Sequence, residues 1–273
     1  MCIRDSILIL QEDGLKGEVH TTMPIEKVSV SEQGIVSAIL KNDTSMKVIC
    51  YDTAGNVLVE HKTSLAGTGY PVDVALSANG EVMQVVYLYT QNGQMVSRLY
   101  YYNFGKAGKD EADHKVSGKN YKNTILASGF FMDADTSVAI GDDCMAIYSG
   151  REVPKQSVKI KMDKEIKSVF HNEKYIGMIL KNQGKGGYEL RLYNKGGKVV
   201  LSKEFKGDYS HVKLCGNQVI MYDGKNCSIF MKNGIQKFKG RMDNNILEMF
   251  PVGGVNQYIV LSANGMEKVR LVK

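Results

Sequence analysis

The stretch Val48-Ile49-Cys50-Tyr51-Asp52-Thr53-Ala54-Gly55-Asn56-Val57-Leu58-Val59 decides the fold of this 273-residue chain. It places an alternating apolar strand on each side of a turn that contains glycine. Period-two alternation bounded by such a turn is the strongest short-range pattern of a β-hairpin. The same pattern returns at residues 8–19, 190–201 and 228–238. No segment shows a sustained period of 3.6, so the sequence predicts an all-β protein with essentially no α-helix.

A second kind of hairpin accompanies these copies and consists of an apolar strand, a tight turn and another apolar strand. It begins at Val28, Val72, Ile166, His211 and Ile246, with a looser copy at Phe130-Phe131. Pairing the two kinds of hairpin gives units of four strands. The first strands of these units recur at intervals of roughly 36 to 55 residues, which is the repeat length expected of propeller blades. The strands are rich in Val, Ile and Phe, as expected of blades that are buried on both faces.

We therefore predict a WD40-like β-propeller of four-stranded antiparallel blades, incomplete at its N-terminus. It is expected to form a single domain over residues 7–273. Residues 7–22 would make half a blade, residues 25–245 five blades, and residues 246–273 a three-stranded partial blade. The five blades are expected to begin near Ile25, Tyr70, Thr124, Glu165 and Tyr209. The charged, glycine-bearing residues 105–123 are predicted to form a surface loop within the second complete blade.

The first residues, 1–6, resemble a translated sequencing-adaptor scar that is joined directly to an apolar strand at residues 7–10. On this interpretation the true N-terminus is missing. The three C-terminal strands then lack the outer strand that would complete their blade, since a propeller normally closes its ring with strands from both termini. We expect an open array with an unpaired strand edge at each end.

Charge and composition narrow the class of partner. The formal net charge is +6, but only six of the 35 basic residues are arginine, the side chain that reads guanine edges and clamps phosphates. The lysines are scattered along the chain, so the sequence predicts a solvated surface and no nucleic-acid partner. No stretch approaches the roughly 18 apolar residues that a membrane span needs, and no secretory segment precedes the fold.

The five cysteines show no C-x-x-C spacing of a zinc or redox site. The best disulfide candidates are Cys215 and Cys227. The strand pattern places them at opposite ends of one blade, beyond the roughly 7 Å that a disulfide allows between Cα atoms. We expect buried free thiols.

Several runs of residues together resemble an uncharacterised clostridial family, domain of unknown function 5711. The runs are EKVSVS (26–31), GYPVDVALS (69–77), YNFG (102–105), EIKSVF (165–170) and EKYIG (173–177). The resemblance implies a propeller-like, extracytoplasmic domain of about eight blades behind a single N-terminal membrane helix. It implies no catalytic motif, and this sequence would lack the anchor, the first blade and half of the second.

Candidate chemical motifs are few. Asp133-x-Asp135-x-Ser137 begins like a calcium loop, but Val138 and Cys144 occupy the positions of the glycine and of the closing glutamate, so a plain turn is predicted. Gly105-x-x-Gly108-Lys109-Asp110 is similar to a phosphate loop, but its spacing is too short for one. Residues 184–187 fit a hairpin turn. These patterns nominate no catalytic, cofactor-binding or metal-binding residue, and we expect no cofactor.

The histidines and tyrosines were the other candidates. His20, His61, His114, His171 and His211 form no H-x-x-x-H pair, and no G-x-S-x-G sequence is present. Tyr87, Tyr89, Tyr100, Tyr101 and Tyr102 flank Asn92-Gly93. Aromatic cross-strand packing explains the tyrosines, and an exposed tyrosine face for a partner is the alternative.

Two functional hypotheses follow. The first is a non-enzymatic binding or sensing scaffold, membrane-anchored and extracytoplasmic, whose partner is a protein, a glycan or a cell-wall component. The second is a propeller hydrolase or lyase with a site in the central channel, since such sites are assembled from distant blades and leave little local sequence pattern. Among the residues that line the channel, convergent carboxylates with a histidine would favour the enzyme. Lysine, serine and threonine would favour binding.

Overall fold

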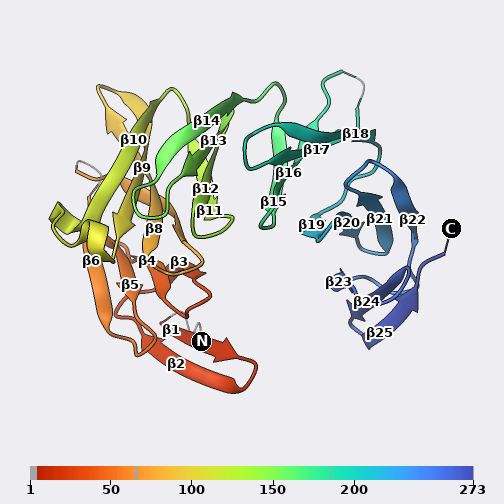
Figure 1. Cartoon of the computed structure of the whole chain (residues 1–273), viewed down its shortest axis with the longest axis horizontal. Coiled ribbons are helices and arrows are strands. Elements are labelled where there is room, and N and C mark those ends of the chain that lie inside the picture. The colour runs from red at the N-terminus through yellow and green to blue at the C-terminus, as the bar shows by residue number, and fades with distance from the viewer. Residues whose placement is uncertain (1–4, 65–66, 185, 273) are drawn as a thin grey trace. The chain divides into compact units, whose positions relative to one another are not determined.

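The computed structural model of the chain describes residues 5–64, 67–184 and 186–272, and its secondary structure is almost entirely β (Figure 1). The helices among the described residues are two three-residue 3-10 helices. The predicted all-β class is therefore confirmed. The chain divides into two compact units, residues 1–162 and residues 163–273, which are described separately. Most of the predicted adaptor scar, residues 1–4, lies outside the described residues.

Unit 1 contains one hairpin and three four-stranded sheets. The hairpin is formed by β1 (Ser6–Gln11) and β2 (Gly14–His20). The first four-stranded sheet contains β3 (Ile25–Val30), β4 (Val36–Lys41), β5 (Met46–Tyr51) and β6 (Val57–Thr63). The second contains β7 (Tyr70–Leu76), β8 (Val82–Gln91), β9 (Gln94–Asn103) and β10 (Lys115–Lys122), with η1 (Lys106–Gly108) and η2 (Ala112–His114) between β9 and β10. The third contains β11 (Leu126–Phe131), β12 (Thr136–Gly141), β13 (Cys144–Ser149) and β14 (Lys155–Lys161).

Unit 2 contains two four-stranded sheets and a three-stranded one. The first contains β15 (Ile166–His171), β16 (Tyr175–Lys181), β17 (Tyr188–Asn194) and β18 (Val199–Phe205). The second contains β19 (His211–Cys215), β20 (Gln218–Asp223), β21 (Asn226–Met231) and β22 (Gln236–Arg241). The last contains β23 (Glu248–Pro251), β24 (Gln257–Ser262) and β25 (Gly265–Arg270).

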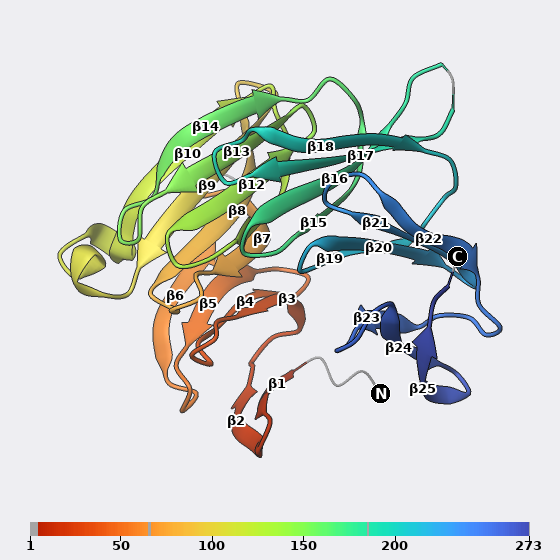
Figure 2. The same cartoon turned by 45° about the vertical axis from the view of Figure 1, so that its right-hand side comes forward.

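Each sheet is a meander in which strands consecutive in sequence pair antiparallel (Figure 2). The predicted four-stranded antiparallel blades are thereby confirmed. Three of the turns between a third and a fourth strand share one hydrogen-bond pattern. The N–H of Asp52 bonds the carbonyl of Asn56 at 2.9 Å, and the N–H of Gly55 returns to Asp52 at 3.1 Å. Gly55 has φ +84°, a left-handed conformation that glycine adopts without steric cost. The same two bonds recur from Asn194 and from Met231.

A buried aromatic residue follows the same repeat. It is the last or next-to-last residue of the third strand. The fourth strand has one extra residue opposite it. The aromatic residues are Tyr51, Tyr148, Tyr193 and Phe230. The extra residues of the fourth strands are Leu58, Ser157, Val200 and Lys237. A β-bulge of this kind bends the strand and increases its twist, so the outer edge of each blade curves at one fixed place.

Each inner sheet is buried on both faces because it packs between two neighbours. Val85 packs into the cluster shared with the β3–β6 sheet, and the next residue, Val86, packs into the cluster shared with the β11–β14 sheet. In unit 2, Val219 packs into the cluster shared with the β15–β18 sheet, and the next residue, Ile220, packs into the cluster shared with the β23–β25 sheet. Full burial of such a side chain contributes about 1.5–3 kcal/mol. The first strands lie side by side within each unit, with β7 between β3 and β11, and β15 next to β19 (Figure 2).

The predicted surface loop at residues 105–123 is wrong in its second half. Residues Lys115–Lys122 form β10, which pairs with β9. Five of its eight residues are exposed, and only Tyr121 is buried. Because an outer strand is held mainly through backbone hydrogen bonds, its side chains can be polar and need not alternate. The pattern of residues 115–122 therefore concealed the strand.

Candidate functional site

The predicted turn at Asp133 is confirmed. The Oδ1 atom of Asp133 accepts the backbone N–H groups of Asp135 at 2.9 Å and Thr136 at 2.7 Å, between β11 and β12. Ser137 lies apart from it, buried in β12 with its hydroxyl 2.7 Å from the Tyr101 hydroxyl. Within the described residues, no group of three His, Cys, Asp or Glu side chains has the geometry of a metal site. The absence of a cofactor stays a prediction.

The two glycine-rich stretches have structural roles. Gly105 precedes η1, and Gly108 is packed so closely on the Asn103 carbonyl that a Cβ would lie 1.9 Å from its oxygen. Residues 105–110 therefore open no phosphate-binding α-helix. The hairpin turn predicted at residues 184–187 connects β16 and β17, with Gly184, Gly186 and Gly187 at positive φ. Its remaining residue, 185, lies outside the described residues.

The tyrosines of β8 and β9 are packed inside unit 1. Tyr87 and Tyr101 have no exposed surface, Tyr89 and Tyr102 are buried, and Tyr100 is half-buried. The Tyr87 and Tyr102 hydroxyl oxygens are 3.1 Å apart, and the centroids of the Tyr87 and Tyr100 rings are 5.8 Å apart. The alternative of an exposed tyrosine face is therefore wrong, since these rings form the core between neighbouring sheets.

The cysteine prediction is confirmed for the described cysteines, apart from the complete burial of Cys215. Cys50, Cys144 and Cys227 are buried free thiols, and Cys215 is a half-buried free thiol. Cys215 pairs with Gln218 at one end of β20, and Cys227 pairs with Tyr222 near the other end. Burial raises the pKa of the Cys50 and Cys227 thiols to about 12. Such thiols are poor nucleophiles, because only the thiolate reacts.

First-strand carboxylates pair with lysines of the preceding first strand. Asp73 on β7 accepts a hydrogen bond from the Lys27 ammonium on β3 at 3.0 Å and from the Gly129 N–H on β11 at 2.9 Å. In unit 2, Lys213 on β19 pairs with Glu248 on β23. Lys167 on β15 likewise pairs with Asp208, just before β19. These carboxylates hold neighbouring sheets together and are not grouped around a histidine.

A buried charge network that the sequence did not predict lies on β17. Both oxygens of Glu189 are saturated: Oε1 accepts from Arg191 Nε at 2.6 Å and Ser202 Oγ at 2.8 Å, and Oε2 accepts from Lys164 Nζ at 2.6 Å and Arg191 Nη2 at 2.8 Å. Burial by itself would raise the pKa of Glu189. The hydrogen bonds from Arg191, Lys164 and Ser202 outweigh it and lower the pKa to about 2. The carboxylate is therefore a fixed anion near neutral pH.

Arg191 completes the network. Its Nη1 atom donates to Asp163 Oδ1 at 2.7 Å and to the Tyr193 hydroxyl at 3.2 Å, and its Nη2 atom reaches Asp163 Oδ2 at 3.3 Å. Together with the bonds to Glu189, these contacts engage all five N–H groups of the guanidinium. Glu189 and Asp163 raise the pKa of Arg191, and Arg191 lowers the pKa of Asp163. Alternating charges on a strand that is otherwise apolar were the one sequence pattern that could have revealed this network.

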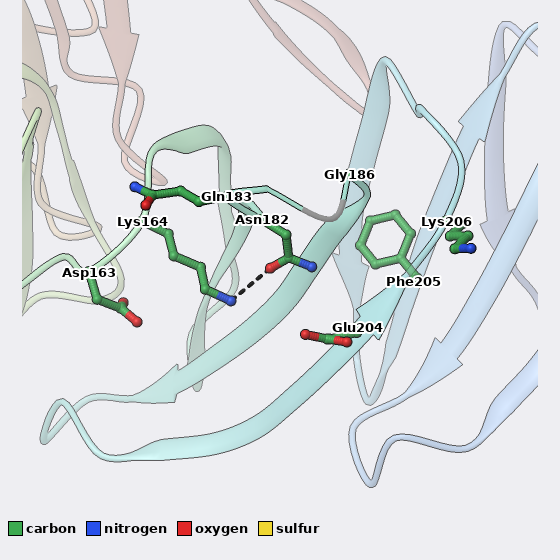
Figure 3. A pocket seen from close by; sticks show the side chains of 8 residues that line it. All are labelled: Asp163, Lys164, Asn182, Gln183, Gly186, Glu204, Phe205 and Lys206. Atoms are coloured by element: carbon green, nitrogen blue, oxygen red, sulfur yellow. Dashed lines mark hydrogen bonds between the residues drawn. The ribbon is translucent and has the colours of Figure 1, made fainter.

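An open cleft of about 730 Å³ adjoins this network at one end of the β15–β18 sheet. Figure 3 shows Lys164 reaching Asn182, whose Oδ1 accepts its hydrogen bond at 2.7 Å, while Glu204 and Phe205 project from β18. The half-buried ring of Phe205 is also part of an aromatic cluster with Tyr188 and Tyr209. The lining thus combines amides, one aromatic ring, the paired charges of Asp163 and Lys164, and the charges of Glu204 and Lys206, which form no ion pair in the described residues. We call it the Phe205 cleft.

A second cleft, of about 500 Å³, lies in unit 1 beside β6 and η2. The His61 ring packs against Tyr102, with centroids 4.6 Å apart. Burial lowers the pKa of His61, an effect that the nearby Asp113 opposes. Its Nε2 atom is enclosed and has no hydrogen-bond partner. A nitrogen without access to solvent cannot exchange a proton with a ligand in the cleft, so Nε2 of His61 cannot act there as a general base.

These sheets and clefts define a propeller-like all-β protein. The chain belongs to a family of unknown function, DUF5711, whose model matches residues 3–271, and this confirms the resemblance found in the sequence. The crystal structure of BamB from Moraxella catarrhalis is similar at 10% sequence identity, over 97% of this chain and 78% of that chain, with a TM-score of 0.52. This likeness concerns the fold alone.

Two further results bear on identity and location. The comparison with curated proteins gave no match. In the part of the chain that the structure describes, no helix is long and apolar enough to cross a membrane.

Proposed function

We propose that this chain is a non-enzymatic binding or scaffold module that holds its ligand at the Phe205 cleft. The state of Glu189 carries the proposal. This carboxylate accepts four hydrogen bonds and has a pKa of about 2. A general acid or base works best with a pKa near the operating pH and needs access to the proton that it moves. Glu189 meets neither condition, and the network instead gives the cleft a rigid polar wall.

The first strands support the same proposal. Their acidic residues Asp73 and Glu248 are engaged by lysines and by backbone or tyrosine donors. A hydrolase or lyase would need at least one group free to protonate a leaving group or to activate water, and in glycoside hydrolysis that group is typically a carboxylate. The alternative enzyme hypothesis therefore has no specific group to support it among these paired residues.

Among the expected partners, a protein, a glycan or a cell-wall component, the chemistry of the Phe205 cleft favours a glycan. The side-chain amides of Asn182 and Gln183 offer both donors and acceptors, and Glu204 offers acceptors, all of which suit sugar hydroxyl groups. The Phe205 ring can contact the apolar face of a sugar ring. Ligand sites commonly combine an apolar surface with a few polar groups that fix orientation.

The extracytoplasmic, membrane-anchored location implied by the family resemblance is part of this proposal. It agrees with a glycan or wall component as the ligand, because such ligands lie outside the cytoplasm. Protease accessibility of an epitope-tagged full-length protein in intact cells would test it. Protection from protease until the cells are lysed would contradict it.

Binding and turnover can be tested together with neutral oligosaccharides, here maltotetraose and chitotetraose. Isothermal titration should detect binding of one of them, weakened by Gln183→Ala and Glu204→Ala and unchanged by Glu173→Ala, which alters an exposed turn residue outside the cleft. Chromatography of the same mixtures should show no cleavage. Turnover that Glu189→Gln abolishes would replace the proposal with the enzyme hypothesis.

A further inference from the structure

A third cleft in unit 2, of about 550 Å³, carries an unbalanced positive charge. It lies at the end of the β19–β22 sheet, where the connection between β18 and β19 meets the end of β22. Its lining includes Lys206, Asp208, Asn226, Lys239 and Arg241. We call it the basic cleft.

The three cations of the basic cleft have no acidic partner in the described residues. Lys206, Lys239 and Arg241 form no ion pair there, and the one lining carboxylate, Asp208, is paired with Lys167. The neighbouring Phe205 cleft differs, because its lining has two acidic side chains, Asp163 and Glu204, and two basic ones, Lys164 and Lys206. Uncompensated charge of one sign in a cleft raises the local concentration of oppositely charged ligands.

The backbone directs these cations to one place. Lys239 and Arg241 are two residues apart on β22 and therefore project from the same face of the sheet. Lys206 approaches from the connection that follows β18. Gly207 and Gly240 also line the cleft and add no side-chain bulk to it. Asn226, opposite Arg241 in the register, contributes an amide donor.

The basic cleft and the Phe205 cleft are adjacent and share one lining residue. Lys206 lines both of them. One extended ligand could therefore contact amides and an aromatic ring in one cleft and three cations in the other. A nucleic acid is a less suitable ligand. Proteins that bind single-stranded nucleic acids without sequence preference stack successive bases on exposed aromatic side chains. Tyr209, the aromatic residue of the basic cleft, is buried.

We propose that the basic cleft binds the anionic groups of an acidic glycan, a sugar chain that bears carboxylate or phosphate groups. The inference rests on the proposed function in taking the ligand to be a glycan. Arg241 supplies a planar fork suited to either group, and the two lysines supply point charges. The neutral part of the chain lies in the Phe205 cleft.

The test uses four probes of similar length in isothermal titration: tetragalacturonate, a glycerol phosphate tetramer, neutral maltotetraose and a short single-stranded DNA. The variant is Lys239→Gln with Arg241→Gln. The matched control is Lys159→Gln with Lys161→Gln, which removes the same charge from the corresponding register positions of β14. All four residues are exposed. Circular dichroism verifies that both double variants fold.

We expect an acidic probe to bind, with at least tenfold loss in the β22 variant, less than twofold loss in the β14 control, and weaker binding at high salt. Whichever acidic tetramer binds identifies the charged group as carboxylate or phosphate. Neutral binding without any preference for acidic probes would overturn this inference and leave the proposed function standing. Equal losses in both variants, or equal affinity for DNA, would also overturn it. Failure of all probes would overturn both proposals.

Discussion

Replacement of Glu189 by glutamine should lower stability near neutral pH and remove part of the acid sensitivity of the protein. The side chain is 4% exposed and accepts hydrogen bonds from three residues, two of them cations. Glutamine keeps the shape but loses the charge, and its NH₂ group must face a donor of Arg191 or Lys164. Breaking a buried charge network in this way typically costs about 3–5 kcal/mol.

The size of the acid effect follows from the pKa of Glu189, which is lowered from 4.5 to about 2. Each pKa unit corresponds to about 1.4 kcal/mol, so the folded state favours the ionised carboxyl by about 3 kcal/mol. Because the folded-state pKa is the lower one, this contribution is present above the unfolded pKa of 4.5. It is lost as the pH falls from there toward 2.

Urea unfolding between about pH 6 and about pH 2 measures the effect directly. The free energy of unfolding of the unsubstituted protein should fall by about 2–3 kcal/mol more than that of Glu189→Gln. Glu173→Gln, at an exposed turn, serves as the control. Other carboxylates contribute equally to both curves, so their effect cancels in the difference. Parallel curves for the protein and the Glu189 variant would refute the assignment of this carboxyl as a fixed buried anion.

Three further predictions concern packing, sheet contacts and metals. Gly177→Ala should destabilise by about 1–3 kcal/mol in urea unfolding, because its Cβ would lie 2.1 Å from the Phe170 ring, whereas Gly253→Ala, with open space around it, should be neutral. Asp73→Ala should cost about 1–3 kcal/mol because it leaves two donors on adjacent first strands unpaired, and full stability in that variant would contradict the role given to these contacts. Elemental analysis of the purified protein should show no stoichiometric calcium or zinc, and finding either would contradict the turn assigned to Asp133.

The hairpins of this protein could be predicted from sequence because their determinants are local. Alternation of apolar residues sets the two faces of a strand, and a glycine at positive φ sets the turn, as at Gly55, Gly197 and Gly234. Both signals lie within a dozen residues. The outer strand β10 lacked them, since its pairing with β9 uses backbone groups that every residue carries.

The sequence was also sufficient to predict that the cysteines form no disulfide and no reactive thiol site. Strand order placed Cys215 and Cys227 at opposite ends of one sheet, and the register confirms this separation. The tyrosines of β8 and β9 show the limit of such reasoning. Their hairpin was predictable, but their burial depends on the sheets packed above and below them.

The sequence by itself determined the class of fold, the hairpins and most of the strands of this protein, because the periodicity and the turn residues that specify them act over a few positions. Tertiary structure alone decided which charges meet. Lys164 lies 25 residues from Glu189, and Asp163 lies 28 residues from Arg191, yet the connection between β14 and β15 brings each pair within hydrogen-bond distance. The same folding leaves Lys206, Lys239 and Arg241 together without an acidic partner in the described residues. Electrostatic energy depends on distances of a few ångströms and on burial, and neither can be read from positions along the chain.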